Sequence, residues 1–140
     1  MIISFDADGT LVDTGFMETF WNRGIPELFS KKHNITFNEA KIKVSDLYHN
    51  VGANDIRWHL PKYWFDILGL EERLEDVIRL FKNDLNVYSD ALSALNILQD
   101  KYELIVISTA PREILDFELE CVGDYFTKSF SSTTDFKKVK

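Results

Sequence analysis

The apolar residues of this chain follow two different spacings along its length. Residues 2–5 and 104–107 are short, largely apolar runs that end at turn-forming residues, a pattern typical of buried β-strands. Between about residues 15 and 85, apolar residues recur every three or four positions, which predicts helices. Residues 129–131 form a third short candidate strand. The order strand, helical insertion, helix, strand, helix, strand predicts a parallel α/β sheet.

The helical region is expected to be interrupted at Gly24-Ile25-Pro26 and at Leu60-Pro61, because glycine and proline disfavour helix interiors. Separate helices are predicted over residues 39–49 and 70–85, then around residues 92–98, and finally over residues 111–121. The apolar positions that define the helices are Phe16, Phe20, Trp21, Leu74, Val77, Ile78, Phe81, Leu85, Leu92, Leu95 and Leu98.

Two carboxylates follow the first predicted strand directly. Asp6 stands at the carboxyl end of the run, where open α/β sheets place their ligands, and a single residue separates it from Asp8. Like charges so close together repel each other, and a bound divalent cation such as Mg²⁺ removes that conflict. The alternative is a β-hairpin with Asp8-Gly9 as its turn, which explains Gly9 but leaves Asp6 without a role.

Composition narrows the classes of protein to consider. The chain has 140 residues, of which 45% are hydrophobic, enough for one folded domain with a small insertion. Its formal net charge of -7 argues against nucleic acid or a membrane surface as a partner. Cys121 is the only cysteine and no apolar stretch is long enough to span a bilayer, so a cytoplasmic location is expected.

A second polar turn follows the second predicted strand. Ser108 and Thr109 lie between the apolar run and Pro111, a residue type favoured at the first position of a helix. Thr109 or Ala110 is then the expected N-cap. A helix N-terminus offers unpaired N–H groups and partial positive charge, so this turn is either an anion site or an ordinary helix cap.

Residues 5–14, with the sequence FDADGTLVDT, resemble the first motif of the haloacid dehalogenase (HAD) superfamily, whose members are mostly phosphatases and phosphotransferases. The resemblance implies a Rossmann-like parallel sheet, Asp6 as a nucleophile that becomes an aspartyl-phosphate, and Asp8 as general acid and base. It also implies Mg²⁺, with Asp6 and Asp8 as the metal-site residues. Carboxyl groups can perform both catalytic roles. Family members that cleave carbon–halogen bonds lack the second aspartate, so Asp8 favours phosphoryl transfer.

The second and third motifs of the family identify further residues. Ser108 matches the Ser or Thr of the second motif and would hydrogen-bond a phosphoryl oxygen, with Thr109 where asparagine is common. The third motif supplies a lysine that balances the charge of nucleophile and phosphate, for which we favour Lys140 over Lys137 and Lys138. A solvated basic tail is the alternative interpretation of these lysines.

The resemblance also implies a helical cap over residues 15–84, inserted between the two parts of the α/β core, residues 1–14 and 85–140. Arg57, in the polar and aromatic segment 54–59, is the candidate in the cap for binding an anionic substrate. The alternative is an ion pair inside the cap or a surface arginine. The candidate substrate-binding residues are Thr10, Arg57, Ser108 and Thr109.

The fourth motif of the family is a later strand ending in acidic residues that complete the Mg²⁺ shell, and it has no counterpart after Ser108. The predicted sheet is therefore an incomplete HAD-like sheet whose first strand is an apolar edge. Three explanations stay open. The chain is a truncated part of a longer enzyme, a second copy covers the edge in a homodimer, or the protein is a natural partial domain without turnover.

The expected function is a Mg²⁺-dependent phosphatase that acts on a small phosphorylated metabolite. One alternative is a HAD-like protein that binds a partner without catalysis, which the missing fourth motif favours. Another is a dehalogenase or other carbon-centred hydrolase, against which Asp8 argues.

Overall fold

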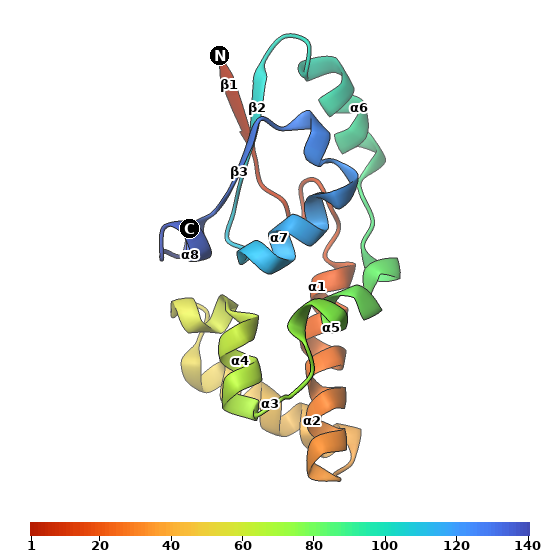
Figure 1. Cartoon of the computed structure of the whole chain (residues 1–140), viewed down its shortest axis with the longest axis vertical. Helices are drawn as coiled ribbons and strands as arrows, with labels where there is room; N and C mark the ends of the chain where they lie inside the picture. The colour runs from red at the N-terminus through yellow and green to blue at the C-terminus, as the bar shows by residue number, and fades with distance from the viewer. The chain divides into compact units, whose positions relative to one another are not determined.

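Three parallel strands form the sheet of this protein. The computed structural model describes residues 1–140, and in it β1 (Ile2–Phe5), β2 (Glu103–Ser108) and β3 (Lys128–Ser131) pair in the order β1-β2-β3 (Figure 1). Phe5 lies opposite Val106 and Val106 opposite Ser129, so the three strands end at the same edge of the sheet. The predicted α/β class and parallel sheet are confirmed. The hairpin alternative is wrong, because β1 pairs with the remote strand β2 in the parallel direction.

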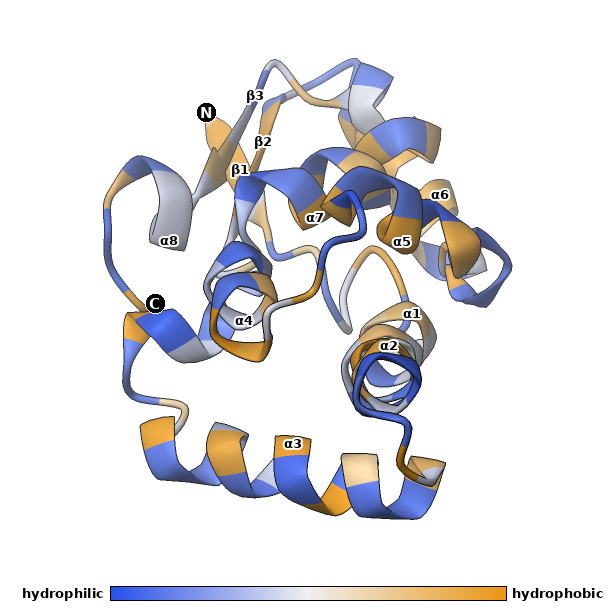
Figure 2. Ribbon diagram, turned by 60° about the horizontal axis from the view of Figure 1, so that its bottom comes forward, coloured by the Kyte–Doolittle hydropathy of each residue, from blue (hydrophilic) through white to orange (hydrophobic).

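The chain divides into two compact units, an α/β unit of Met1–Thr14 with Leu85–Lys140 and a helical unit of Gly15–Asp84. In the α/β unit, α6 (Ser89–Leu98) and α7 (Arg112–Glu118) lie on the same side of the strands in Figures 1 and 2. Two 3₁₀ turns, η4 (Leu119–Cys121) and η5 (Gly123–Tyr125), lead from α7 to β3, and α8 (Ser132–Asp135) follows β3. The buried apolar side chains of the core include Leu95, Leu104, Val106, Ile114 and Leu115.

Strand β1 forms one edge of the sheet, as the sequence predicts. Met1 is 92% exposed and Ile2 is 58% exposed at this edge. Exposed apolar strands of this kind are ready to pair with another strand. Coverage of the edge by a second copy of the chain stays a prediction.

The helical unit begins with an almost continuous helical path. α1 (Gly15–Thr19) runs into a π-helical turn, η1 (Phe20–Gly24), and then into α2 (Ile25–His33). The predicted break at Gly24-Ile25-Pro26 is wrong, because the first two residues keep helical backbone angles and Pro26 lies in the first turn of α2. The missing N–H of a proline is not needed there. Gly24 is required by close packing, since a Cβ atom would lie 2.6 Å from the ring of Phe81.

The other helices of this unit are α3 (Phe37–Val51), α4 (Pro61–Leu68) and α5 (Leu74–Leu80), with 3₁₀ turns at η2 (Ile56–His59) and η3 (Lys82–Asp84). The predicted break at Leu60-Pro61 is confirmed. α3 begins earlier than predicted because Thr36 and Glu39 form a capping box, in which the Glu39 N–H donates to the Thr36 hydroxyl oxygen at 3.3 Å. None of the helices is both long and apolar enough to cross a membrane.

Replacing Thr36 by alanine should lower the free energy of unfolding by about 1 kcal/mol, because it removes the hydroxyl group that caps α3. Urea denaturation followed by circular dichroism measures the change. The control is Thr19→Ala, since Thr19 makes no side-chain cap hydrogen bond and alanine suits a helix. Equal losses of stability in the two variants would contradict the capping role.

Candidate functional site

The turn after β1 is built around the backbone of Ala7. Its carbonyl oxygen accepts hydrogen bonds from the N–H groups of Thr10, Leu11 and Val12, at 3.2, 2.9 and 3.2 Å. The Gly9 N–H donates to the carbonyl oxygen of Val12 at 2.7 Å, and Gly9 has a φ of 72°, a left-handed conformation that glycine adopts without strain. Backbone hydrogen bonds within the turn therefore hold the segment that carries both aspartates at the end of the strand.

Asp6 and Lys140 form an ion pair at this end of the sheet. The ammonium nitrogen of Lys140 lies 2.8 Å from Oδ2 of Asp6 and donates a hydrogen bond of 2.7 Å to the carbonyl oxygen of Ile107. Oδ1 of Asp6 accepts the N–H of Ala7 at 2.9 Å. The side chain of Asp6 is 44% exposed, so a solute can reach it. An accessible carboxylate beside a cation is suited to attack an anionic group.

The three lysines that the sequence leaves as alternatives have different positions. Lys140 is the one paired with Asp6. Lys137 lies near Asp135 instead. Burial opposes the lowering of the Asp135 pKa, which the Ser131 N–H and Arg112 bring about, with a smaller contribution from the charge of Lys137. The backbone N–H of Lys138 donates to the carbonyl oxygen of Ser132 at 3.0 Å. The geometry thus favours Lys140 as the partner of the first carboxylate.

Asp8 interacts with a second carboxyl group, that of Glu118 at the end of α7. Glu118 is completely buried, and neither of its carboxyl oxygens has a hydrogen-bond partner of ordinary geometry. Burial raises the pKa of Asp8, contact with Glu118 partly offsets this, and the charge of Asp6 raises the pKa further. Burial also raises the pKa of Glu118, with the charges of Asp8 and Asp6 adding to the effect. The pair therefore keeps protons at a pH where isolated carboxyl groups are ionised.

The sequence carries no signal for Glu118. It is one of several glutamates in a helical segment, and nothing in its spacing sets it apart from a solvent-facing residue. Its position beside Asp8 depends on how α7 packs against the turn after β1, which local sequence does not specify. Its burial became evident only from the structure.

The turn after β2 brings Ser108 to the same edge of the sheet as Asp6, because β1 and β2 are parallel neighbours. Ser108 is buried, and its hydroxyl oxygen accepts the N–H of Ala110 at 3.1 Å. Pro111 is the N-cap of α7, and no side-chain cap hydrogen bond is present. The prediction of Thr109 or Ala110 as N-cap is wrong, since Ser108 turns the chain with Ala110 and the helix begins only after Pro111.

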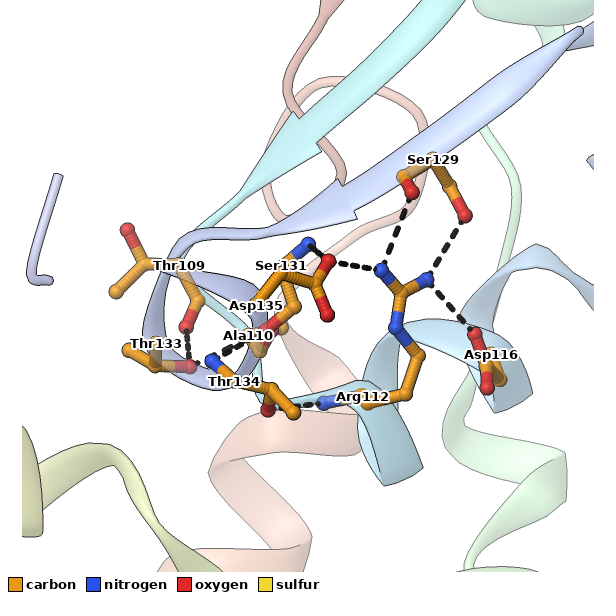
Figure 3. A network of polar contacts seen from close by, with 9 residues as sticks. All are labelled: Thr109, Ala110, Arg112, Asp116, Ser129, Ser131, Thr133, Thr134 and Asp135. Carbon is orange, nitrogen blue, oxygen red and sulfur yellow. Dashed lines mark hydrogen bonds and ion pairs between the residues drawn. The ribbon is translucent and has the colours of Figure 1, made fainter. Parts of the chain in front are cut away.

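A network of polar contacts ties the start of α7 to the chain around β3 and α8 (Figure 3). The guanidinium group of Arg112 donates to the hydroxyl and carbonyl oxygens of Ser129, at 2.9 and 3.1 Å, and pairs with the carboxylate of Asp135. The same carboxylate accepts the N–H of Ser131 at 2.8 Å. A guanidinium can make several such bonds at once because its donors form a fixed planar fork.

Two hydroxyl groups extend this network to the turn after β2 (Figure 3). The Ser131 hydroxyl donates to the carbonyl oxygen of Ala110 at 2.7 Å. The Thr133 hydroxyl donates to the carbonyl oxygen of Thr109 at 2.9 Å. The segment that leads to Lys140 is therefore held against the turn that contains Ser108.

The two other predicted substrate-binding residues have different surroundings. Thr10 is exposed in the turn after β1. Arg57 belongs to the helical unit, where its Nη2 atom lies 2.6 Å from Oδ2 of Asp55 and its Nε atom 2.9 Å from Oδ1. Hydrogen bonding from Arg57 lowers the pKa of Asp55 to about 2. This geometry agrees with the alternative of an ion pair inside the helical unit, and a contact between Arg57 and substrate stays a prediction.

The oxygen atoms of Asp6 and Asp8 are the candidate ligands for a divalent cation at this site. The Asp6 carboxylate is accessible and Mg²⁺ prefers oxygen ligands, whereas burial raises the pKa of the Asp8 carboxyl, so Asp8 is suited to offer the ion its backbone carbonyl oxygen. No group of three or more His, Cys, Asp or Glu side chains is placed so that it could hold a metal ion by itself. Protein sites often bind Mg²⁺ through one or two carboxylates, with water and phosphate completing the shell. The two aspartates fit Mg²⁺ as such a partial set of ligands.

Known proteins resemble the chain in both sequence and fold. The family model of haloacid dehalogenase-like hydrolases matches residues 1–140. GMP/IMP nucleotidase YrfG of Escherichia coli (strain K12) is 35% identical over 69 residues, which make up 49% of this chain and 31% of that protein. The nucleotidase of the same name from Shigella flexneri gives the same values.

Among solved structures, a HAD phosphatase from Thermococcus onnurineus superimposes with a TM-score of 0.77 and 23% sequence identity. The match covers 94% of this chain and 61% of that one, and it shows a shared fold. The chain spans less than two thirds of the length of each of these relatives.

Replacing Glu118 by glutamine should change how stability depends on pH in metal-free protein. The native pKa of Glu118 lies well above that of an unfolded glutamate, so between the two values the native state keeps a proton that the unfolded chain has released. The free energy of unfolding of the parent protein therefore falls as pH rises through this window, by up to about 1.4 kcal/mol per pH unit from this group. Glu118→Gln lacks this contribution and should gain stability relative to the parent as pH rises from about 5 to 8.

Urea denaturation at a series of pH values, with a chelator present, measures this difference. The control is Glu120→Gln, because Glu120 is exposed in the same part of the chain and its variant should parallel the parent protein. A constant offset between Glu118→Gln and the parent across the series would show that the pKa of Glu118 is not raised.

Proposed function

Because the chain belongs to the haloacid dehalogenase-like hydrolases, we propose that it hydrolyses the phosphoric ester of a small metabolite, with Mg²⁺ and an aspartyl-phosphate on Asp6. The observation that carries the proposal is the ion pair between Asp6 and Lys140, whose Oδ2 and Nζ atoms are 2.8 Å apart. A carboxylate that attacks a phosphate needs a nearby cation, because two anions otherwise repel each other. Lys140 supplies this cation.

In the first half of the reaction, a carboxylate oxygen of Asp6 attacks phosphorus. A bond forms between that oxygen and phosphorus while the bond from phosphorus to the ester oxygen breaks. Asp8 gives its proton to the departing oxygen, which leaves as an alcohol. Burial raises the pKa of Asp8, which suits a general acid because the group keeps its proton at a higher pH than an isolated aspartate.

In the second half, the ionised Asp8 takes a proton from a water molecule whose oxygen attacks phosphorus. The bond between Asp6 and phosphorus breaks, inorganic phosphate leaves and the Asp6 carboxylate is restored. Asp8 recovers its proton in this step, so the cycle closes. Glu118 does not touch the phosphoryl group in this scheme, and its interaction with Asp8 helps to set the pKa of that acid.

Phosphate charge is balanced by several groups in the proposed mechanism. Mg²⁺ would be held by the Asp6 carboxylate and the backbone carbonyl oxygen of Asp8, which leaves the Asp8 carboxyl to carry its proton, and when bound the ion offsets negative charge on the phosphoryl oxygens. Thr10, Ser108 and Thr109 would donate hydrogen bonds to the same oxygens. The Ser108 hydroxyl oxygen accepts the Ala110 N–H, which leaves the hydroxyl proton for this purpose.

Nucleoside monophosphates are the first substrates to test. Two relatives of 35% identity over 69 residues are GMP/IMP nucleotidases. A nucleoside monophosphate also meets the needs of the mechanism, because it carries one phosphoryl group on an alcohol oxygen that can leave with a proton from Asp8.

Asp6→Asn should abolish hydrolysis of p-nitrophenyl phosphate by the full-length protein in Mg²⁺, lowering kcat by at least roughly a thousandfold, because an amide is a poor nucleophile. Mass spectrometry of the acid-quenched parent protein should find a phosphoryl group on Asp6. The control is Asp124→Asn, an exposed aspartate of the same unit that should keep full activity. Unchanged turnover in Asp6→Asn would reject the mechanism. In a separate measurement, a chelator should abolish the activity of the parent protein.

Lys140→Ala should lower kcat by roughly a hundredfold or more, because it removes the cation that contacts Asp6. Steady-state kinetics of the full-length protein measure the loss. Lys138→Ala is the matched control, since Lys138 is exposed and close in sequence, and it should behave like the parent protein. A comparable loss in both variants would mean that Lys140 is not the lysine that acts in catalysis.

A further inference from the structure

Lys140 reaches Asp6 from a segment that is neither helix nor strand. Residues 136–140 follow α8 without regular structure, and the side chain of Lys140 is 40% exposed. A lysine side chain has many rotamers, so holding its end in one place costs conformational entropy. The position of the ammonium group therefore depends on what fixes the backbone of this segment.

The carboxylate of Asp135 fixes the base of the segment. It accepts the N–H of Ser131, the last residue of β3, at 2.8 Å, and it pairs with the guanidinium group of Arg112 (Figure 3). The Ser131 hydroxyl oxygen accepts the N–H of Thr134 at 3.1 Å and so caps α8. One carboxylate thus ties the start of α8 to α7.

A tight turn after α8 leads from this base to the lysine. The N–H groups of Phe136 and Lys138 both donate to the carbonyl oxygen of Ser132, at 3.3 and 3.0 Å. Between them, Lys137 has a φ of 56°, the left-handed conformation in which many helices end. A single residue then separates the turn from Lys140, so we expect a displacement of α8 to move the lysine as well.

Arg112 holds α8 from the neighbouring helix α7 through several contacts. Its backbone N–H donates to the Thr134 hydroxyl oxygen at 3.0 Å, and its guanidinium group binds both Asp135 and Ser129. The side chains of Arg112 and Asp135 are 28% and 30% exposed, so salt and water screen this pair less than one on the open surface. The planar fork of a guanidinium can serve two partners at once in a way that an ammonium group cannot.

We propose that Arg112 and Asp135 are positioning residues, which place Lys140 beside Asp6 and thereby set the rate of phosphoryl transfer without touching the phosphoryl group. The inference rests on the function proposed above for its effect on the rate, whereas its effect on the lysine can be measured without substrate. A misplacement of about 1 Å can slow a reaction by about a hundredfold, so an ion pair that makes no contact with the reacting atoms can still control turnover.

Arg112→Ala should lower kcat of the full-length protein by roughly tenfold or more, because the segment that carries Lys140 loses its anchor on α7. Arg112→Lys should also be slower than the parent, since an ammonium does not replace the fork, and it serves where the alanine variant does not fold. The control is Asp116→Asn. Asp116 accepts a hydrogen bond from Arg112 at 3.2 Å, but it lies on α7 itself and is 61% exposed, so this variant should keep the kcat of the parent. Parent-like kcat in both Arg112 variants would overturn the proposal.

A double-mutant cycle separates positioning from a general loss of stability. In the Lys140→Ala background, Arg112→Ala should lower kcat by less than about twofold, because the lysine that Arg112 positions is already absent. A smaller folded fraction would instead reduce kcat by the same factor in both backgrounds. Circular dichroism checks that every variant is folded under the assay conditions. Losses that multiply in the double variant would contradict the positioning role.

Acetylation by acetic anhydride, followed by mass spectrometry, tests the placement of Lys140 independently of hydrolysis. In the parent protein, the contacts of its ammonium group with Asp6 and with the Ile107 carbonyl oxygen should slow the reaction. The internal reference is Lys101, an exposed lysine of the same unit. Relative to Lys101, acetylation of Lys140 should become roughly two- to fivefold faster in both Asp6→Asn and Arg112→Ala, the effect of losing a partly exposed ion pair.

The two measurements distinguish failure of this inference from failure of the proposed function. Faster acetylation of Lys140 in Arg112→Ala but not in Asp116→Asn, without hydrolysis of p-nitrophenyl phosphate by the parent, supports the placement of the lysine by Arg112 and rejects the phosphatase chemistry. Hydrolysis that Asp6→Asn abolishes, with an unchanged rate of Lys140 acetylation in Arg112→Ala, rejects the positioning role alone.

Discussion

Crowding of carboxyl groups at the end of β1 is the constraint around which the α/β unit is organised. Asp6, Asp8 and Glu118 interact with one another there, and Lys140 contacts only the first of them closely. Asp6 has a cation at 2.8 Å and access to solvent, whereas Asp8 is shielded and has another acid beside it. Two chemically identical side chains thus acquire different properties from their surroundings. That difference is what a nucleophile and a proton donor require of a pair of aspartates.

The short helix α7 connects both sides of this site. At its start, Arg112 binds Ser129 and Asp135 and so holds the segment that precedes Lys140. At its end, Glu118 packs beside Asp8. One helix of seven residues therefore contacts both the acid and the segment that leads to the lysine.

Sequence patterns predict the elements whose signals are local and miss those that depend on remote contacts. The apolar runs of β1 and β2 and the spacing within α6 predict that these elements exist, although β2 and α6 are longer than their predicted ranges. The π-helical turn at η1 is not predictable in this way, because it brings Gly24 against Phe81, which is distant in the chain. Glu118 has no local signal at all. Lys140 could be named only through the family resemblance, since its partner Asp6 lies at the opposite end of the sequence.

The chain leaves the α/β unit and returns to it at adjacent points. Val12 pairs with Val87 in the antiparallel direction, and flanking backbone hydrogen bonds of 2.9 and 3.0 Å fasten this junction. The helical unit is therefore an insertion whose two ends are joined by this bridge. The entropic cost of closing an inserted segment rises only slowly with its length. Because the ends of the insertion are fixed to each other, a different set of helices could replace it without changing the register of the strands that carry the carboxylates.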